Sequence, residues 1–259
     1  MHNCTEEIAD ELRRHVDWLA KRRGAWPADF RLQNLSGISL PNVSLQYARL
    51  AGANLGRCDL TGANLSNCDM FAATLHGATL VNANLARSDL RGAQLYEADL
   101  TSANLEATDF REGALLTSDN NRGLALVEPE VWEAKDTVRP RANLRRAKLS
   151  KSNLVSANLT GAVMAETVLA GANLRRANLA GADLQDADLS DADLSGCNLT
   201  AANLANAKMK GAKLIGADLS NVDLATVDLS DADLTDARVM RIISDLAPID
   251  MVVRQRRRS

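Results

Sequence analysis

Aromatic side chains are scarce in this sequence, which holds three Trp, two Tyr and three Phe among 259 residues. A globular core or a ligand pocket normally draws on more of them. Four cysteines are too few for a disulfide scaffold. The three histidines, His2, His15 and His76, are too scattered to suggest a metal cluster or a catalytic triad. These absences argue against an enzyme, a small-molecule substrate, a cofactor or a bound metal.

Long apolar runs are absent as well. No stretch approaches the ~20 apolar residues that span a membrane. The acidic residues Glu6, Glu7, Asp10 and Glu11 are followed by nothing like the apolar core of a secretory signal. The formal net charge of -3 implies no general affinity for nucleic acid or for membranes. We therefore expect a soluble, cytoplasmic protein that contacts neither of them directly.

What the sequence does contain is a five-residue repeat. Every fifth residue is apolar, and usually Leu, from Leu35 to Leu115 and again from Leu144 to Val239. Two positions earlier the residue is nearly always small. The consensus A-[DN]-L-x-x is complete at residues 53–55, 98–100 and 187–189, among others. Repeats of this kind decide the architecture before any other signal does.

A period of five fits neither regular element. Five residues advance an α-helix by about 500°, so the leucines would form no stripe. Side chains of a strand alternate with a period of two, and five is odd. Both apolar positions can point inward only if the chain turns a corner in every repeat. The pattern therefore predicts a solenoid, with Cys58, Cys68 and Cys197 filling small inward positions.

The run of A-[DN]-L-x-x motifs over most of the chain resembles the pentapeptide-repeat family. The resemblance implies an all-β solenoid, a right-handed quadrilateral parallel β-helix with four repeats per coil and about nine coils here. Well-studied members of that family bind type II topoisomerases such as DNA gyrase, and some protect the enzyme from quinolones. The family explanation is that a negatively charged rod of suitable width mimics duplex DNA. A protein partner of that class is thus implied for this chain.

Both ends of the repeat array carry non-repeat sequence. Residues 1–29 are expected to form a helical cap, because Ile8, Leu12, Val16 and Leu19 recur at helical spacing. Gly24 is expected to end that helix. Residues 240–259 form an apolar segment followed by a basic tail. The segment 240–253 either caps the stack or mates with a second chain as a homodimer, and the sequence leaves both open.

The repeat is interrupted over residues 116–141, between a first stack at 30–115 and a second at 142–239. Asn120, Asn121 and Gly123 favour a turn within it, and residues 129–135 favour a short helix. Loops on rigid scaffolds often carry function, so Trp132 is a candidate contact residue for a partner. The alternative is a loop that packs on one wall of the stack.

Charge is the remaining feature that could specify a partner. Residues 183–236 hold eleven Asp and three Lys. With four repeats per coil, residues 20 apart should stack in columns. Lys208 and Lys213 then each lie between two aspartates, which weakens the resemblance to the uniform charge of a phosphate backbone.

Two functions follow from these features. The preferred one is a non-catalytic scaffold that binds a protein partner through its rigid walls or through the 116–141 excursion. The alternative is a DNA mimic that binds gyrase or another topoisomerase and confers resistance to a drug or toxin. The acidic residues that would serve a partner on the walls are Asp69, Asp89, Asp109, Asp183, Asp188, Asp193, Asp223, Asp228 and Asp233.

Overall fold

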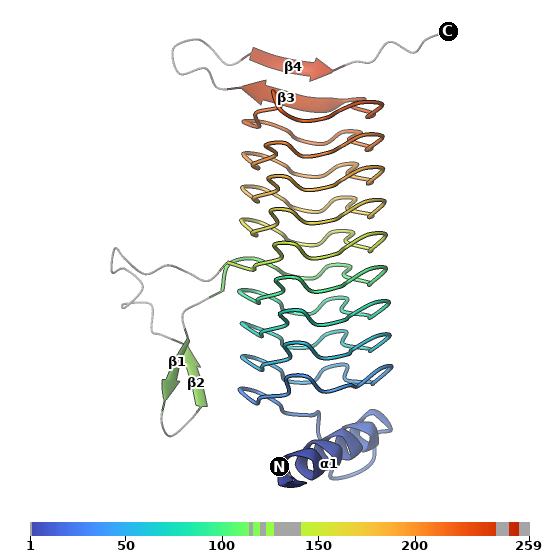
Figure 1. Ribbon diagram of the computed structural model, residues 1–259, viewed down its shortest axis with the longest axis vertical. Coiled ribbons are helices and arrows are strands. Elements are labelled where there is room, and N and C mark those ends of the chain that lie inside the picture. The colour runs from blue at the N-terminus through green and yellow to red at the C-terminus, as the bar shows by residue number, and fades with distance from the viewer. Residues whose placement is uncertain (1, 114–115, 120–122, 127–140, 242–248, 254–259) are drawn as a thin grey trace.

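The computed structural model describes residues 2–113, 116–119, 123–126, 141–241 and 249–253. Between its helix and its last two strands the chain forms a four-sided stack of coils (Figure 1). The regular elements are α1 (His2–Leu19), β1 (Leu116–Asp119), β2 (Gly123–Leu126), β3 (Ala237–Arg241) and β4 (Ile249–Val253). Strands β1 and β2 pair antiparallel, as do β3 and β4.

The stack has four walls, each held by parallel bridges between residues of successive coils. We name each wall after one bridged aspartate. The Asp69 wall runs from Asp29 to Arg238, and the Asp183 wall from Asn34 to Asn203. The Asp188 wall runs from Ser39 to Asp228, and the Asp193 wall from Ser44 to Asp233. The predicted spacing of 20 residues between stacked positions is confirmed, for example by the Asp69–Asp89 bridge.

Each corner of a coil is a tight turn that explains the repeat's polar positions. In one example the N–H of Cys58 donates to the carbonyl of Leu55 at 3.2 Å, and Arg57 between them has a φ of 57°. This is the left-handed conformation of a type II turn, which favours Gly or Asn. Before the turn, Asn54 Oδ1 accepts a hydrogen bond from the N–H of Gly56 at 3.0 Å. Asp or Asn recurs there because only a short side-chain carbonyl reaches that N–H.

The interior is filled as the repeat predicts. The Leu positions and the small residues two before them are buried through the middle of the stack, as Leu90, Leu184 and Ala187 illustrate at 0% exposure. Cys58, Cys68 and Cys197 are buried as well, which confirms them as core residues. Burial raises the pKa of the Cys68 and Cys197 thiols to about 12. These thiols are therefore protonated and unreactive at neutral pH.

The two repeat series form a single stack. Parallel β-bridges join Gln94 to Asn143 and Asp109 to Asn158. At this junction the bridged residues are 49 positions apart in the sequence instead of 20. The Asn153 amide donates to Asn104 Oδ1 at 3.1 Å across the same junction. The ladders therefore continue across the 29 extra residues without interruption. Trp132 and the expected short helix at 129–135 lie outside the described residues.

Excision of the excursion is expected to leave the stack intact. Removing residues 113–141 joins Glu112 to Ala142, and Phe110 is then followed at the repeat spacing by Leu144. Because the ladders already bypass the excursion, we expect a cooperative thermal melt within a few degrees of that of the full chain. Circular dichroism at increasing temperature measures this. A broad transition or the loss of β signal would show that the excursion supports the stack.

Helix α1 lies against the N-terminal end of the stack (Figure 1). Ile8 is buried and Leu12 packs against the core, as expected. The expectation for Val16 is wrong, since this residue is 57% exposed while His15 is fully buried. Ile8, Leu12 and His15 are separated by four and three residues, so they lie on one face of the helix. Val16 follows His15 directly and therefore lies about 100° around the helix axis from it. A polar residue thus occupies a position that the apolar pattern did not reveal.

The helix also ends earlier than Gly24. Lys21 has a φ of 57°, its N–H donates to the carbonyl of Trp18 at 2.8 Å, and the N–H of Arg22 donates to that of Asp17 at 3.0 Å. This pair of bonds is a Schellman motif closed by a lysine instead of a glycine. Within the described ranges, no helix is long and apolar enough to cross a membrane.

Strands β3 and β4 lie at the opposite end of the stack (Figure 1). Strand β3 continues the last coil through the Asp218–Arg238 bridge, and it pairs with β4 from Ala237 to Arg241. On the Asp69 wall the last coil therefore does not end in an unpaired strand edge, because β4 pairs with β3. Association of two chains through residues 240–253 stays a prediction.

Candidate interaction surfaces

The interior of the described stack is filled with buried Leu and Ala side chains. None of the described residues form a group of three or more His, Cys, Asp or Glu side chains that could hold a metal. The surface depressions that are lined by described residues include the following two. One of about 390 Å³ is lined by Asn54, Arg57 and His76 among others, and one of about 360 Å³ adjoins Arg111 and Arg141 where the excursion leaves the stack. The outer surface is therefore a candidate for partner contacts.

All nine candidate aspartates have a local structural role. Each accepts a hydrogen bond through Oδ1 from the backbone N–H two residues ahead, as Asp193 does from Ser195 at 3.0 Å. The other eight are Asp69, Asp89, Asp109, Asp183, Asp188, Asp223, Asp228 and Asp233. Their abundance follows from the turn chemistry of the repeat and needs no partner to explain it.

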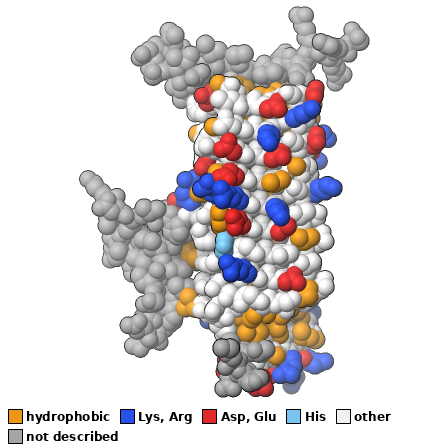
Figure 2. All heavy atoms as spheres, in the orientation of Figure 1, with side chains coloured by type: hydrophobic (Ala, Val, Ile, Leu, Met, Phe, Trp, Pro, Cys, Tyr) orange, Lys and Arg blue, Asp and Glu red, His pale blue; other side chains and the backbone are white. Residues whose placement is uncertain are grey.

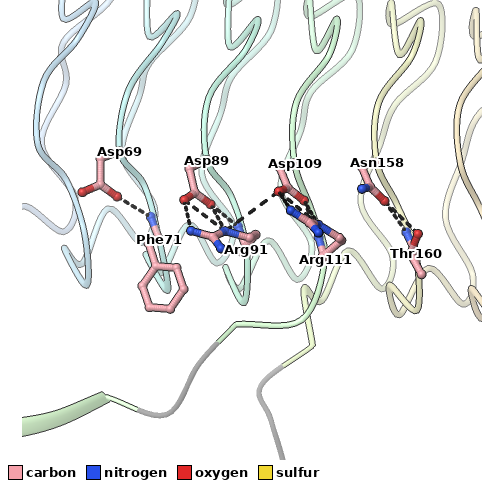
Figure 3. A network of polar contacts seen from close by, with 8 residues as sticks. All are labelled: Asp69, Phe71, Asp89, Arg91, Asp109, Arg111, Asn158 and Thr160. Atoms are coloured by element: carbon pink, nitrogen blue, oxygen red, sulfur yellow. Dashed lines mark hydrogen bonds and ion pairs between the residues drawn. The ribbon is translucent and has the colours of Figure 1, made fainter. Parts of the chain in front are cut away.

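Arginines neutralise most of the acidic column on the Asp69 wall. Figure 3 shows Asp89 paired with Arg91 and Asp109 paired with Arg111. The closest Arg91–Asp89 contact is 2.6 Å, and Arg111–Asp109 is 2.8 Å. Arg91 also lies 3.9 Å from Asp109, which links successive coils. One arginine for each of these two carboxylates leaves little net negative charge for a DNA-like surface.

Lysines divide the acidic columns on two other walls, as the sequence predicts. Lys208 forms backbone β-bridges with Asp188 and Asp228 in the two adjacent coils. Lys213 forms the same bridges with Asp193 and Asp233. A hydrogen bond from the Thr235 hydroxyl is the main cause that lowers the pKa of Asp233, and Lys213 lowers it further. On the Asp183 wall, Asp183 accepts a hydrogen bond from the Asn203 amide at 2.9 Å. The acids therefore alternate with bases or amides along these walls.

A cluster at the corner between the Asp183 and Asp188 walls was not predicted. His76 and Tyr96, in adjacent coils, stack with ring centroids 5.1 Å apart. Arg146 donates to the Tyr96 hydroxyl at 3.0 Å and pairs with Glu166 at 2.7 Å. Hydrogen bonds from Arg145 and then Arg146 lower the pKa of Glu166. The sequence hid this cluster, because Tyr96 and Arg146 become neighbours only when the excursion is bypassed.

Aromatic residues also gather at the N-terminal end. The rings of Trp18 and Tyr47 meet edge to face with their centroids 5.9 Å apart. The Cζ atom of Arg14 lies 5.3 Å from the centroid of the Trp26 ring. Phe30 is buried against the first coil, but Trp26 is 49% and Tyr47 53% exposed. Elsewhere the face in Figure 2 has acidic and basic side chains interspersed. Exposed aromatics therefore mark the N-terminal end, and interspersed charge marks the walls.

The chain is similar to proteins of known structure, although no curated protein matches it significantly. One of these structures is HetL, a pentapeptide repeat protein involved in heterocyst differentiation regulation in the cyanobacterium Nostoc sp. strain PCC 7120. HetL is 29% identical to this chain. The alignment covers 85% of this chain and 93% of HetL, with a TM-score of 0.45.

Two further structures share the repeat. A pentapeptide repeat protein of the Arabidopsis thaliana thylakoid lumen is 29% identical over 40% of this chain and 69% of its own, with a TM-score of 0.36. QnrB1, a plasmid-mediated fluoroquinolone resistance protein, is 19% identical over 79% of this chain and 85% of its own, with a TM-score of 0.32. The pentapeptide-repeat model matches several segments within residues 28–106, 142–200 and 202–239. The chain is therefore a member of the pentapeptide-repeat family, and it forms a scaffold of stacked repeats.

Proposed function

We propose that this protein is a non-catalytic scaffold that binds a protein partner through its outer surface. The observation that carries the proposal is the complete filling of the interior, where Leu and Ala side chains are buried coil after coil. A rigid rod of this kind holds outward residues at fixed spacing, so little order is lost when a partner binds. The partner contacts would come from the walls, their corners or the excursion.

Two regions are the strongest candidates for those contacts. The first is the corner cluster of the partly buried His76 and Tyr96 with the exposed Arg146, because Tyr and Arg side chains contribute most to protein interfaces. The second is the excursion, which includes Trp132 and leaves the stack between Gly113 and Arg141. Since the excursion is dispensable for the ladders, a role in recognition would explain its presence.

Affinity capture with matched variants tests this proposal. The full chain is compared with the 113–141 excision, with the double variant Tyr96→Ala/Arg146→Ala, and with Lys151→Ala as a control on a different corner. We expect at least one partner to be captured by the full chain and by Lys151→Ala. That partner should be lost with the excision or with the double variant. Equal capture by all four proteins would contradict both candidate regions.

DNA mimicry toward a type II topoisomerase is the second candidate function. The excess of eleven Asp over three Lys in residues 183–236 favours it. Two arrangements count against it: the arginine pairs on the Asp69 wall, and the lysines that divide the aspartates of the Asp188 and Asp193 walls. Phosphates along a DNA strand carry charge of a single sign. For this reason the scaffold that binds a protein by other contacts is the preferred function.

A further inference from the structure

The Asp193 wall carries a charge pattern that is complementary to itself when reversed. Along its centre, successive coils present Asn173, Asp193, Lys213 and Asp233. In the opposite direction the order is Asp, Lys, Asp, Asn. If two copies of this wall face each other in antiparallel orientation, each Lys213 lies opposite Asp193 of the second copy. Each Asp233 then lies opposite Asn173, and no like charges meet along the centre.

Both corners of this wall obey the same symmetry. At the corner shared with the Asp69 wall, the exposed Arg175 and Arg176 lie three coils from the exposed Asp236. In the antiparallel pairing Arg176 therefore faces Asp236 of the second copy. At the corner shared with the Asp188 wall, Lys210 faces Asp191 of the second copy. Three kinds of opposite-charge contact thus form, each occurring twice because a two-fold axis repeats every contact.

The register of the pairing is fixed by the same charges. A shift of the two-fold axis by half a coil spacing toward the N-terminus places Asp193 opposite Asp193. A shift of the same size toward the C-terminus places Lys213 opposite Lys213 and Asp193 opposite Asp233. Both shifts bring like charges together at a few ångströms, which is unfavourable even in a solvated interface. Of these three alignments, only the first keeps like charges apart along the centre of the wall.

An apolar side chain lies within this surface. Ile215 is 40% exposed, and it is the one large exposed hydrophobic residue outside positions 16–47 in the described part of the chain. In the antiparallel pairing it faces Ser195 and Gly196 of the second copy. Gly196 and Gly216, with φ of 70° and 64°, have no side chain, so the two corners can approach closely. Ile215 would lose water on contact, which favours association.

We propose that the Asp193 wall is an interface between two antiparallel copies of this chain. The occupant is a second copy, because Asp193, Asp191 and Arg176 each face an opposite charge in the same wall reversed, and Asp233 faces the neutral Asn173. An interface of only a few coils is small for a specific complex. The dimer is therefore weak, and salt dissociates it because its contacts are exposed ion pairs. This inference depends neither on the proposed partner nor on the segment 240–253.

Sedimentation of single variants and of their mixture tests the interface. Lys213→Glu places an acid opposite Asp193 of the second copy, and Asp193→Lys places a base opposite Lys213. We expect each variant alone to associate on the order of tenfold more weakly than the wild type at low ionic strength. Mixed together, the two variants should form a heterodimer. The two substituted side chains then face each other with opposite charge in one contact, and the unaltered Asp193 and Lys213 face each other in the other.

Lys208→Glu is the matched control, since Lys208 also lies between two aspartates but on the Asp188 wall. It should associate like the wild type. Arg176→Glu mixed with Asp236→Lys is a second complementary pair, in which no lysine between aspartates is altered. A wild type that stays monomeric at low ionic strength would overturn the proposal. Folded single variants that associate normally, or complementary mixtures that stay monomeric, would overturn it as well.

Discussion

Leu184→Ala is expected to lower the free energy of unfolding by ~2–5 kcal/mol. Leu184 has 0% exposure and packs within a stack whose neighbouring coils are held by backbone hydrogen bonds, such as Leu184 N–H to Asn203 O at 2.8 Å. Those bonds prevent the coils from closing over the missing atoms, so the cavity persists. For a chain of this size the melting temperature should fall by roughly 5–15 °C. Thermal melts followed by circular dichroism measure the change.

Leu32→Ala is the control for this truncation. Leu32 occupies a turn and is 45% exposed, so its loss should change stability by less than about 0.5 kcal/mol. A stack in which each coil contacts only its neighbours can also unfold in parts, and a second transition in Leu184→Ala would be consistent with this packing. Equal melting temperatures for Leu184→Ala and the wild type would contradict it.

Acidification is expected to weaken the N-terminal end through His15. Its Nδ1 accepts a hydrogen bond from the N–H of Ala28 at 3.0 Å, and its Nε2 is buried without a hydrogen-bond partner. Burial lowers the pKa of His15, and the nearby Glu11 only partly opposes this. The folded protein thus prefers neutral His15, and its stability is retained above the unfolded pKa of ~6.5. Stability is lost as the pH falls below that value toward the lowered pKa.

The charged groups around His15 set the size of this effect. Glu11 accepts a hydrogen bond from the N–H of Asp29 at 2.8 Å and pairs with Arg14, and Trp18 stacks on the imidazole. Protonation of Nδ1 would make it a hydrogen-bond donor, so it could no longer accept the bond from the Ala28 N–H. In His15→Gln the side-chain carbonyl can accept the same bond without titrating. We expect the melting temperature of the wild type to fall more between pH 7 and pH 5 than that of His15→Gln.

The corresponding control is His76→Gln, which removes a histidine from the surface cluster. It measures the effect of losing a histidine that lies outside the cap. If His15→Gln retains the full pH dependence, then His15 does not link the cap to protonation. The carboxylates of the stack are the same in all of these proteins, so the comparison between variants cancels their contribution.

The solenoid could be predicted because the repeat obeys a strict local rule, in which a corner in every five residues places both apolar positions inside. The four sides, and with them the column of Asp188, Lys208 and Asp228, were implied by the family resemblance. Val16 and Gly24 show where a local pattern is insufficient. His15 is buried because its ring accepts a hydrogen bond from the first coil, and the helix is ended by the bonds of Lys21 and Arg22. Neither contact has a signature in hydrophobic periodicity.

The candidate site was less predictable than the fold. The sequence places Asp69, Asp89 and Asp109 in one column, but it does not tell which arginine turns toward which carboxylate. The stacking of His76 on Tyr96 follows from the 20-residue spacing, whereas the bond from Arg146 to Tyr96 spans the excursion. Its discovery requires knowing that the ladders continue directly from Gln94 to Asn143. Trp132 stays a sequence-based prediction.

Opposite charges lie next to one another along the walls of the stack. We therefore expect the walls to bind a protein partner and not to mimic DNA. DNA supercoiling by gyrase in the presence of this protein, with and without a fluoroquinolone, tests this claim most directly. We expect unchanged supercoiling and unchanged drug inhibition up to micromolar protein, because a surface with alternating charge does not compete with DNA for the enzyme. Inhibition of supercoiling, or rescue from the drug, over the same concentration range would contradict the claim.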